Sequence, residues 1–395
     1  MTALPSLARS GWLKQPSLQR VFSLIAEAGG EARVAGGAVR NGLLKIPVGD
    51  IDIATTLPPQ KIMAIFAAAG FKAHPTGIEH GTVTVVVDKT TYEVTTLRRD
   101  VSTDGRRAVV SFTDDWVEDA RRRDFTMNAL YCDARGKIYD YTNGYEDILR
   151  RRIIFVGPPQ ARIKEDYLRI LRYFRFLSVF DGMKPDKAGL AACVRLKKGL
   201  LTLSAERIAQ EMFKLLVGSH AVPVLKIMAR HKVLKNIMAH TDDFRTVARL
   251  PADPLLRSFA LAKNPASLRE AFRLSNAQAK RIDALMRGNS ISPKFRDNEQ
   301  RRILYALGAQ GWHDSVSLAW ARSRASLNDA AWKRMLDLAA VWTLPSFPVS
   351  GQDLMELGFP PGPDMGHELR RLEELWIASD FKPTKDELLK SMKRD

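Results

Sequence analysis

Apolar residues recur at helical spacing in two segments near the start of the chain. Residues 18–29 show one amphipathic pattern, which ends in a pair of glycines, and residues 60–69 show another, which Gly70 ends. Glycine is common directly after a helix because it adopts a left-handed backbone conformation without strain. The pattern therefore predicts two helices in this part of the chain.

The segments around these helices show the composition of strands. Residues 81–87 and 91–97 are rich in β-branched side chains and flank the polar turn Asp88–Thr90, which predicts a β-hairpin. Further strands are predicted at 50–54, 130–133 and 137–141, the last two as a second hairpin. After residue 146 strand signals nearly vanish, and successive helices are predicted. The expected fold class is α+β, with a mixed β-sheet in an N-terminal head and a long helical remainder.

Length and charge narrow the class of protein. A chain of 395 residues is longer than a single hydrophobic core usually accommodates, so two or more domains are expected. The net charge of +17 favours a polyanionic partner, with nucleic acid ahead of a membrane surface; a generally basic protein with no binding role is the alternative. Two cysteines are too few for a disulfide framework or a zinc site. No apolar run reaches membrane-spanning length, and the N-terminus lacks a signal-peptide core, so a cytoplasmic protein is expected.

A pair of glycines followed by an arginine is the first candidate for chemistry. Gly36 and Gly37 come after the apolar run 32–35, and they let the backbone turn sharply and approach a ligand closely. A helix-like segment begins there, whose free N–H groups suit a phosphate, and Arg40 adds a cation. A glycine pair alone is usually only a turn, but with Arg40 it predicts a grip for phosphate groups.

Two acids follow at strand spacing. Asp50 and Asp52 are two residues apart, so in a strand both carboxylates leave the same face. Adjacent carboxylates repel each other unless a divalent cation neutralises them, and Mg²⁺ favours such oxygens together with substrate phosphates. Alone, this spacing of two acids is more often a solvated turn. Next to a predicted phosphate-binding turn, the acid pair indicates phosphoryl transfer from a nucleotide.

The two features together carry a family resemblance. Gly36–Arg40 followed by Asp50–Asp52 resembles the signature of the DNA polymerase β-like nucleotidyltransferases, in particular the class II branch of CCA-adding tRNA nucleotidyltransferases and bacterial poly(A) polymerases. That family usually has Asp where this chain has Asn41. In the family an acid in an E-V-T-T-L-R strand completes the catalytic triad, and Glu93 matches it. On sequence alone, an acid at that position of a strand is more often solvent-facing.

Arg122–Ala129 resembles the RRDFTxNA motif of the same family, and its simpler interpretation is a helix start with basic flanks. The functional interpretation is that Arg123 meets a phosphate or the base, while Asp124 and Asn128 hold the ribose or order the site. A carboxylate can accept a hydrogen bond from a 2′-hydroxyl, which distinguishes ribonucleotides. The preceding polar stretch, residues 98–121, is a loop by its pattern, and the resemblance implies a flexible loop, with 104–107 at its tip, that reshapes the site.

Residues 165–176 predict one helix with a polar face. At 100° per residue an arc of about 120° holds six side chains, namely Glu165, Asp166, Arg169, Arg172, Tyr173 and Phe176. The alternative is a surface helix with ordinary ion pairs. Cytosine and adenine present an amino donor beside a ring-nitrogen acceptor, and uracil and guanine present the reverse. Asp166 beside Arg169 would therefore accept C and A and reject U and G. This matches the EDxxR motif of class II enzymes, where side chains act as the template.

The remaining matches extend the resemblance along the chain. The resemblance implies that Arg172 and Arg175 contact the triphosphate or hold the template side chains in place. Arg175 lies outside the polar arc of the predicted helix. Residues 147–157 resemble the motif that joins head to neck, 204–211 the motif that braces the template helix, and 351–366 part of the tail. The resemblance thus implies a nucleotidyltransferase head (1–146), a neck with the template helix (147–225), a body (226–335) and an RNA-binding tail (336–395).

The implied activity is template-independent addition of C, C and A to tRNA 3′ ends, from CTP and ATP with Mg²⁺. Asp50 and Asp52 would hold the metals, Glu93 would support activation of the 3′-hydroxyl, and Gly36, Gly37 and Arg40 would grip the triphosphate. A poly(A) polymerase or an enzyme that adds only CC or A shares every motif, so these alternatives stay open. An RNA-binding protein with an inactive head would lack the acids, and small-molecule nucleotidyltransferases lack the template helix. The expected partners are the acceptor arm of tRNA and the two nucleotides, with no membrane; the oligomeric state stays open.

Overall fold

The structure is a computed structural model that describes residues 3–103, 108–288 and 290–392. The chain divides into two compact units, Met1–Ile237 and Met238–Asp395, and each is described by itself. The predicted loop tip at 104–107 lies outside the described residues. The domain boundaries at 146, 225 and 335 stay a prediction.

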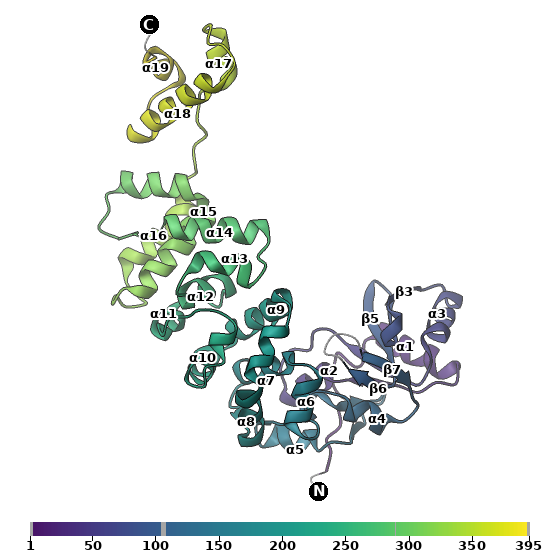
Figure 1. Cartoon of the computed structure of the whole chain (residues 1–395). Helices are drawn as coiled ribbons and strands as arrows, with labels where there is room; N and C mark the ends of the chain where they lie inside the picture. The colour runs from purple at the N-terminus through teal and green to yellow at the C-terminus, as the bar shows by residue number, and fades with distance from the viewer. Residues whose placement is uncertain (1–2, 104–107, 289, 393–395) are drawn as a thin grey trace. The chain divides into compact units, whose positions relative to one another are not determined.

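The first unit begins with a seven-stranded sheet (Figure 1), in the order β3-β4-β5-β2-β1-β8-β9. The strands are β1 (Ala32–Ala35), β2 (Asp52–Thr55), β3 (Lys72–Gly77), β4 (Thr82–Val87), β5 (Thr90–Thr96), β8 (Leu130–Cys132) and β9 (Ile138–Asp140). Strands β2 and β5 are parallel, and the other neighbours in this sheet are antiparallel. The expected mixed sheet and both predicted hairpins are therefore confirmed.

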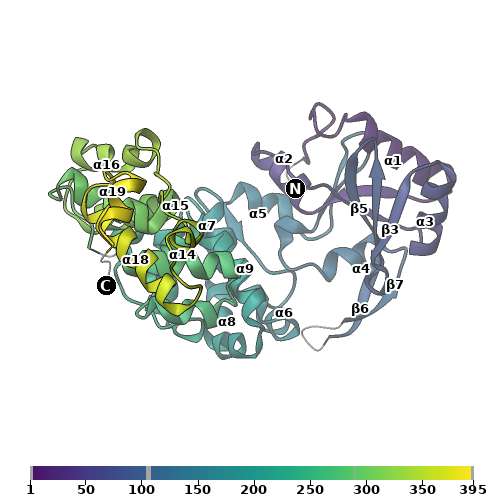
Figure 2. The same ribbon diagram turned by 90° about the horizontal axis from the view of Figure 1, so that it is seen from above.

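Two helices cover one face of this sheet and decide which side chains face away from them. Helices α1 (Pro16–Glu27) and α3 (Pro59–Ala68) pack on β1, β3, β4 and β5 (Figure 2). Tyr92 and Val94 of β5 are buried, and the Tyr92 hydroxyl bonds Ser17 of α1. Because successive side chains alternate across a strand, Glu93 lies on the opposite face. The sheet therefore has one closed face and one face free for chemistry.

The sequence pattern missed several elements of the head. The stretch 98–121, expected to be a loop, holds the hairpin β6 (Arg98–Thr103) and β7 (Ala108–Phe112) and the helix α4 (Trp116–Arg121). Strand β3 was also not predicted. The strand expected at 50–54 begins only at Asp52, so Asp50 lies in the segment that leads into β2. Strands β6 and β7 pair only with each other among the described residues, as a separate two-stranded sheet.

The rest of the first unit is mainly helical. Its helices are α2 (Gly37–Leu44) within the head, then α5 (Gly144–Leu149), α6 (Pro159–Glu165), α7 (Leu168–Val179), α8 (Lys187–Leu196), α9 (Ala205–Leu216) and α10 (Ala221–Arg230). Shorter 3₁₀ segments are η1 (Ile78–His80), η2 (Thr126–Asn128), η3 (Lys197–Thr202) and η4 (Leu234–Asn236). A two-residue pair, β10 (Arg152–Ile153) with β11 (Lys184–Pro185), is also present. The helical remainder is thus confirmed.

The single helix predicted over 165–176 is wrong, because the chain leaves helical geometry at Asp166. Helix α6 ends at Glu165, Asp166 has extended φ and ψ of −154° and 108°, and α7 begins at Leu168. The Asp166 carboxylate accepts a hydrogen bond from the Leu168 N–H at 3.0 Å, a local side-chain bond that competes with helical ones. Tyr173 is fully buried and stacks on Phe155, so it belongs to the core rather than to the predicted polar face.

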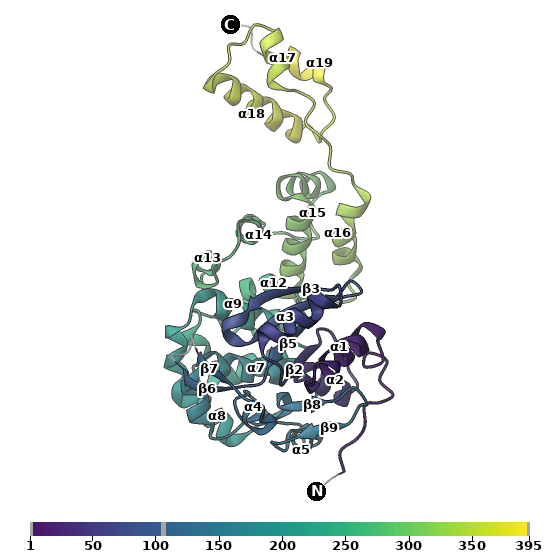
Figure 3. The ribbon, with the colours of Figure 1, turned by 90° about the vertical axis from the view of Figure 1, so that its right-hand side faces the viewer.

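The second unit is helical in its described residues, and two of its apolar clusters mark where its helices pack. Its helices are α11 (Phe244–Arg249), α12 (Pro254–Leu261), α13 (Leu268–Ala271), α14 (Asn276–Arg287), α15 (Asp297–Arg322), α16 (Ala330–Val341), α17 (Gly351–Glu356), α18 (Pro363–Ala378) and α19 (Lys385–Lys390), with η5 (Pro265–Ser267). One cluster gathers around Trp312 and Trp332. The other gathers around Leu372 and Trp376, where α17, α18 and α19 meet (Figure 3). None of the helices in the described ranges is long and apolar enough to cross a membrane.

Candidate nucleotide-binding site

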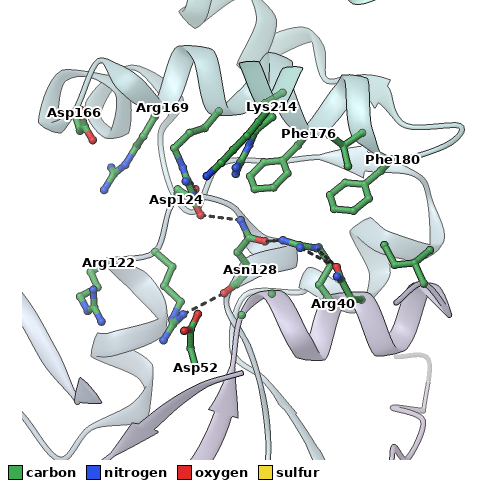
Figure 4. Close-up of a pocket in the computed structure, with 18 of the residues that line it drawn as sticks. Arg40, Asp52, Arg122, Asp124, Asn128, Asp166, Arg169, Phe176, Phe180 and Lys214 are labelled. Atoms are coloured by element: carbon green, nitrogen blue, oxygen red, sulfur yellow. Dashed lines mark hydrogen bonds and ion pairs between the residues drawn. The ribbon is translucent and has the colours of Figure 1, made fainter. Parts of the chain in front are cut away.

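A cavity of about 720 Å³ brings together the residues that the sequence singled out for nucleotide binding (Figure 4). It is lined by all ten of them, Gly36, Gly37, Arg40, Arg123, Asp124, Asn128, Asp166, Arg169, Arg172 and Arg175, and by Asp52. It is also lined by residues that were not predicted, among them Asn41, Arg122, Phe176, Phe180 and Lys214. Motifs more than 100 residues apart in the sequence therefore share one cavity.

Gly36 closes the turn at the start of α2. Its φ is +71°, and a Cβ there would lie 3.3 Å from Nη1 of Arg123 and 3.4 Å from the carbonyl oxygen of Asn128. A side chain would be strained by that backbone conformation and crowded by those atoms. Gly37 has no comparable restriction, since its Cβ would meet only Nη2 of Arg40 at 3.7 Å. The glycine requirement is therefore strict at Gly36.

Arg40 is held by two neutral amides. Its Nη1 donates to Oδ1 of Asn128, and its Nε and Nη2 donate to Oδ1 of Asn41 at 3.1 and 2.8 Å. The guanidinium also lies 4.7 Å from the centre of the Phe180 ring. Burial, together with the charge of Arg175, lowers the pKa of Arg40 to about 10. Arg40 therefore remains a cation at neutral pH.

Asp124 joins the head to helix α7. It accepts from Nδ2 of Asn128 at 3.0 Å and from Nε of Arg172 at 2.7 Å, and Figure 4 shows Asp124, Asn128 and Arg40 in one hydrogen-bonded row. Burial opposes ionisation of Asp124, but the charge of Arg172 together with the hydrogen bonds from Asn128, Arg172 and the Phe125 N–H lowers the pKa of the carboxyl. Asp124 therefore stays ionised and aligns both neighbours.

Asp119 of α4 was missed by the sequence analysis. It is 1% exposed and pairs with Nη2 of Arg122 at 2.6 Å and Nη2 of Arg123 at 3.0 Å, while the hydroxyl of Tyr131 donates to it at 2.6 Å. Burial opposes its ionisation, but Arg123 and Arg122 lower the pKa of the Asp119 carboxyl. The sequence could have identified Asp119 by its spacing, because Arg122 and Arg123 follow it by three and four residues. Residues at that spacing lie on the same face of a helix.

One of the three acids predicted to be catalytic, Asp52, lines this cavity. Asp52 and Glu93 are directly paired in the parallel register of β2 and β5, so their side chains leave the same face of the sheet. Partial burial and the negative charges of Glu93 and Asp50 raise the pKa of Asp52, while Arg123 opposes that rise. Asp52 lines the cavity; Asp50 and Glu93 do not. The structure therefore places Asp50 and Glu93 within electrostatic reach of Asp52.

These acids have the donor chemistry for a divalent cation. Their carboxylate oxygens are the ligands that Mg²⁺ prefers, and their mutual repulsion at Asp52 is the electrostatic condition that a cation relieves. Among the described residues, no three His, Cys, Asp or Glu side chains are grouped closely enough to hold an ion alone. An ion here would therefore complete its coordination with phosphate oxygens and water.

Asp166 and Arg169 are each fixed by a neighbour. Nη2 of Arg207 donates to Oδ2 of Asp166 at 2.8 Å, and Nη1 of Arg169 donates to Glu165 at 2.6 Å and to the carbonyl of Arg162 at 2.8 Å. Figure 4 shows both side chains on the wall of the cavity that faces Asp124. They lie together although the predicted continuous helix is absent.

Comparison with known proteins bears on the whole chain. Family models match three consecutive parts, described as the poly(A) polymerase head domain (residues 32–154), an RNA- and SrmB-binding site of polymerase A (182–244) and domain 2 of a tRNA nucleotidyltransferase (255–392). The mitochondrial CCA tRNA nucleotidyltransferase 1 of Homo sapiens is 33% identical over 97% of this chain and 93% of its own length. The chain belongs to the family of CCA-adding enzymes and poly(A) polymerases.

Bacterial members of this family show the same extent of similarity. The CCA-adding enzyme of Latilactobacillus sakei is 31% identical over 94% of this chain and 96% of its own. The crystal structure of the Bacillus stearothermophilus CCA-adding enzyme in complex with CTP superimposes with a TM-score of 0.78, at 29% identity over 93% of this chain and 94% of that chain. The expected family and fold class are therefore confirmed.

Proposed function

We propose that this protein adds C, C and A to the 3′ ends of tRNA, using CTP and ATP without a nucleic-acid template. The observation that carries the proposal is the single cavity in which the phosphate-binding turn, the RRDF segment and the template residues meet. The names of the relatives, CCA-adding enzymes and CCA tRNA nucleotidyltransferases, support CCA addition over poly(A) synthesis. The net charge of +17 suits a tRNA substrate held through its phosphates, and we place the activity in the cytoplasm.

Each group of residues has a distinct role in this proposal. Asp50 and Asp52 would hold Mg²⁺, which supplies charge stabilisation at the transferring phosphorus when bound. Glu93 would accept the proton of the attacking 3′-hydroxyl, for which its position beside Asp52 is suitable. Arg40, Arg172 and Arg175, with Gly36 and Gly37, would bind the triphosphate, and the charge that develops during transfer would be stabilised by these guanidinium groups.

The remaining cavity residues would select the nucleotide. Asp124 and Asn128 would contact the ribose, and Arg123 a phosphate or the base. Asp166 would accept from the amino group of cytosine or adenine, and Arg169 would donate to the neighbouring ring nitrogen. A base with the reverse pattern leaves both groups unpaired in a partly buried site, which costs about 1–3 kcal/mol for each group.

The test is the addition reaction on a tRNA that lacks its 3′ end. With CTP alone the expected product is two residues longer, with CTP and ATP three, and with ATP alone unchanged, as read by mass spectrometry of the RNA. An Asp52→Ala enzyme is the matched inactive control. Long tails from ATP alone would contradict the proposal and indicate a poly(A) polymerase, and products that stop at CC, or that need CC already present, would indicate a partial enzyme.

A further inference from the structure

Arg40 differs from the other arginines of the cavity in its partners. Each of the others pairs with a carboxylate, namely Arg122 and Arg123 with Asp119, Arg169 with Glu165, Arg172 with Asp124, and Arg175 with Glu211. In the described part of the chain, the hydrogen bonds of the Arg40 guanidinium go to the amide oxygens of Asn41 and Asn128. The charge of Arg40 is therefore oriented without being paired.

The orientation of the Asn41 amide follows from its neighbours. A guanidinium can only donate, so the atom of Asn41 that faces Arg40 is the carbonyl Oδ1. A backbone carbonyl can only accept, so the atom that faces the Pro47 oxygen, at 2.9 Å, is Nδ2. Asn41 thus joins α2 to the segment after it, three residues before Asp50. An aspartate, the usual residue of the family here, could not donate to Pro47.

We propose that Asn41 is a positioning residue that keeps Arg40 as an unpaired cation for the nucleotide phosphates and anchors the segment that leads to Asp50. The inference rests on the proposed function for the identity of the nucleotide. It follows from charge: a carboxylate at position 41 would pair with Arg40 as Asp119 pairs with Arg123, and less of the charge would remain for the ligand. A neutral amide gives the same alignment and leaves the charge available.

A double-mutant cycle on nucleotide binding tests the action through Arg40. Equilibrium binding of CTP with Mg²⁺ is measured for the full chain, Asn41→Leu, Arg40→Gln and the double variant. Leucine has a similar size and removes all three hydrogen bonds of the Asn41 side chain, two from Arg40 and one to Pro47. We expect Asn41→Leu to raise the Kd for CTP about tenfold, the effect of about one charge-assisted hydrogen bond. In the Arg40→Gln background the same substitution is expected to have no further effect. Asn328→Leu, at an exposed site of the second unit, is the control.

Two further readouts separate the contact of Asn41 with Arg40 from its contact with Pro47. Asn41→Asp is expected to weaken CTP binding and make it less dependent on salt, because Arg40 is then paired. At saturating CTP, Asn41→Leu is expected to lower kcat even in the Arg40→Gln background, because the Pro47 carbonyl has lost its donor. A merely structural role would change stability without this division between Kd and kcat.

The outcomes that overturn the proposal are specific. Unchanged CTP binding in Asn41→Leu, or an equal loss with and without Arg40, refutes the action through Arg40. An Asn41→Asp variant that binds CTP as tightly as the wild type refutes the charge argument, and an unchanged kcat refutes the link to Asp50. If the wild type binds CTP but does not extend tRNA, the proposed function fails while the cycle still decides the role of Asn41.

Discussion

Replacing Asp119 by asparagine would remove the one negative charge that two cavity arginines share. The carboxylate is 1% exposed, whereas the side chains of Arg122 and Arg123 are 16% and 20% exposed. Removing one partner of a buried ion pair costs about 3–5 kcal/mol, because the other charge is left uncompensated. Water can reach part of each guanidinium here, so we expect a loss of about 3 kcal/mol, at the lower end of that range.

The pH dependence of this loss has a defined sign. The folded-state pKa of Asp119 is depressed, so its stabilising effect is complete above the unfolded-state pKa of about 3.9 and disappears as the pH falls toward the folded-state value. The difference between wild type and Asp119→Asn should therefore be constant from about pH 5 to 8 and should shrink below about pH 4.

Hydrogen exchange is the appropriate assay because the chain has two compact units and a single unfolding transition is not assured. Amides of α4 and β8 should lose protection by a factor of about 100, which corresponds to about 3 kcal/mol. The Kd for CTP should rise as well, since Arg123 is no longer fixed. Asp88→Asn, at an exposed turn, is the control for the chemical change. Unchanged protection together with unchanged CTP binding would refute the reasoning.

Three further predictions concern catalysis and recognition. Asp50→Ala or Asp52→Ala should abolish transfer while tRNA binding persists, and Glu93→Gln should be milder; activity within about tenfold of wild type in either alanine variant would count against metal binding there. The affinity for tRNA should fall steeply between low and physiological salt, with log K linear in log salt concentration, and a flat response would contradict phosphate-based binding. Asp166→Ala should reduce the preference for CTP and ATP over UTP and GTP by about one to two orders of magnitude, as measured with all four nucleotides, whereas an unchanged preference would place base selection elsewhere.

The elements that sequence predicted best are those that depend on neighbouring residues alone. The hairpin of β4 and β5 follows from β-branched alternation and a turn at Asp88 and Lys89, both of which take positive φ. The cavity residues were predictable because each lies in a short continuous motif. Such a motif can be recognised by its similarity to a family without knowledge of the fold. Their convergence on one cavity was implied by the family rather than by any local pattern.

The features that sequence missed depend on partners far along the chain. The break at Asp166 is decided by its own carboxylate, which bonds the Leu168 N–H and the distant Arg207; such side-chain bonds compete with helical ones. Because the periodicity argument assumed one helix axis, it assigned Tyr173 to the polar face. Arg175, off the predicted arc, nonetheless lines the cavity.

The partners of Asp166 and Arg169 bear directly on how a protein can select a base. The two oxygens of Asp166 each accept one bond, from Leu168 and from Arg207, but a carboxylate offers about four lone-pair positions. Arg169 uses Nη1 for Glu165 and the Arg162 carbonyl, and a guanidinium has about five N–H donors in a fixed fork. Asp166 and Arg169 are therefore each oriented on one side and keep hydrogen-bonding capacity on the other.

The orienting groups come from two helices that flank α7. Arg207 lies on α9, which packs against α7, and Glu165 ends α6. A nucleic-acid template brings its own rigid base edge, whereas here the edge is assembled from side chains of separate helices. If Asp166 and Arg169 select the base as proposed, discrimination between C or A and the other bases depends on the packing of α6, α7 and α9 as much as on the two side chains. Under this proposal a small rotation of α9 would turn the Asp166 carboxylate and change which base fits, and it would leave Asp50, Asp52 and Glu93 unchanged.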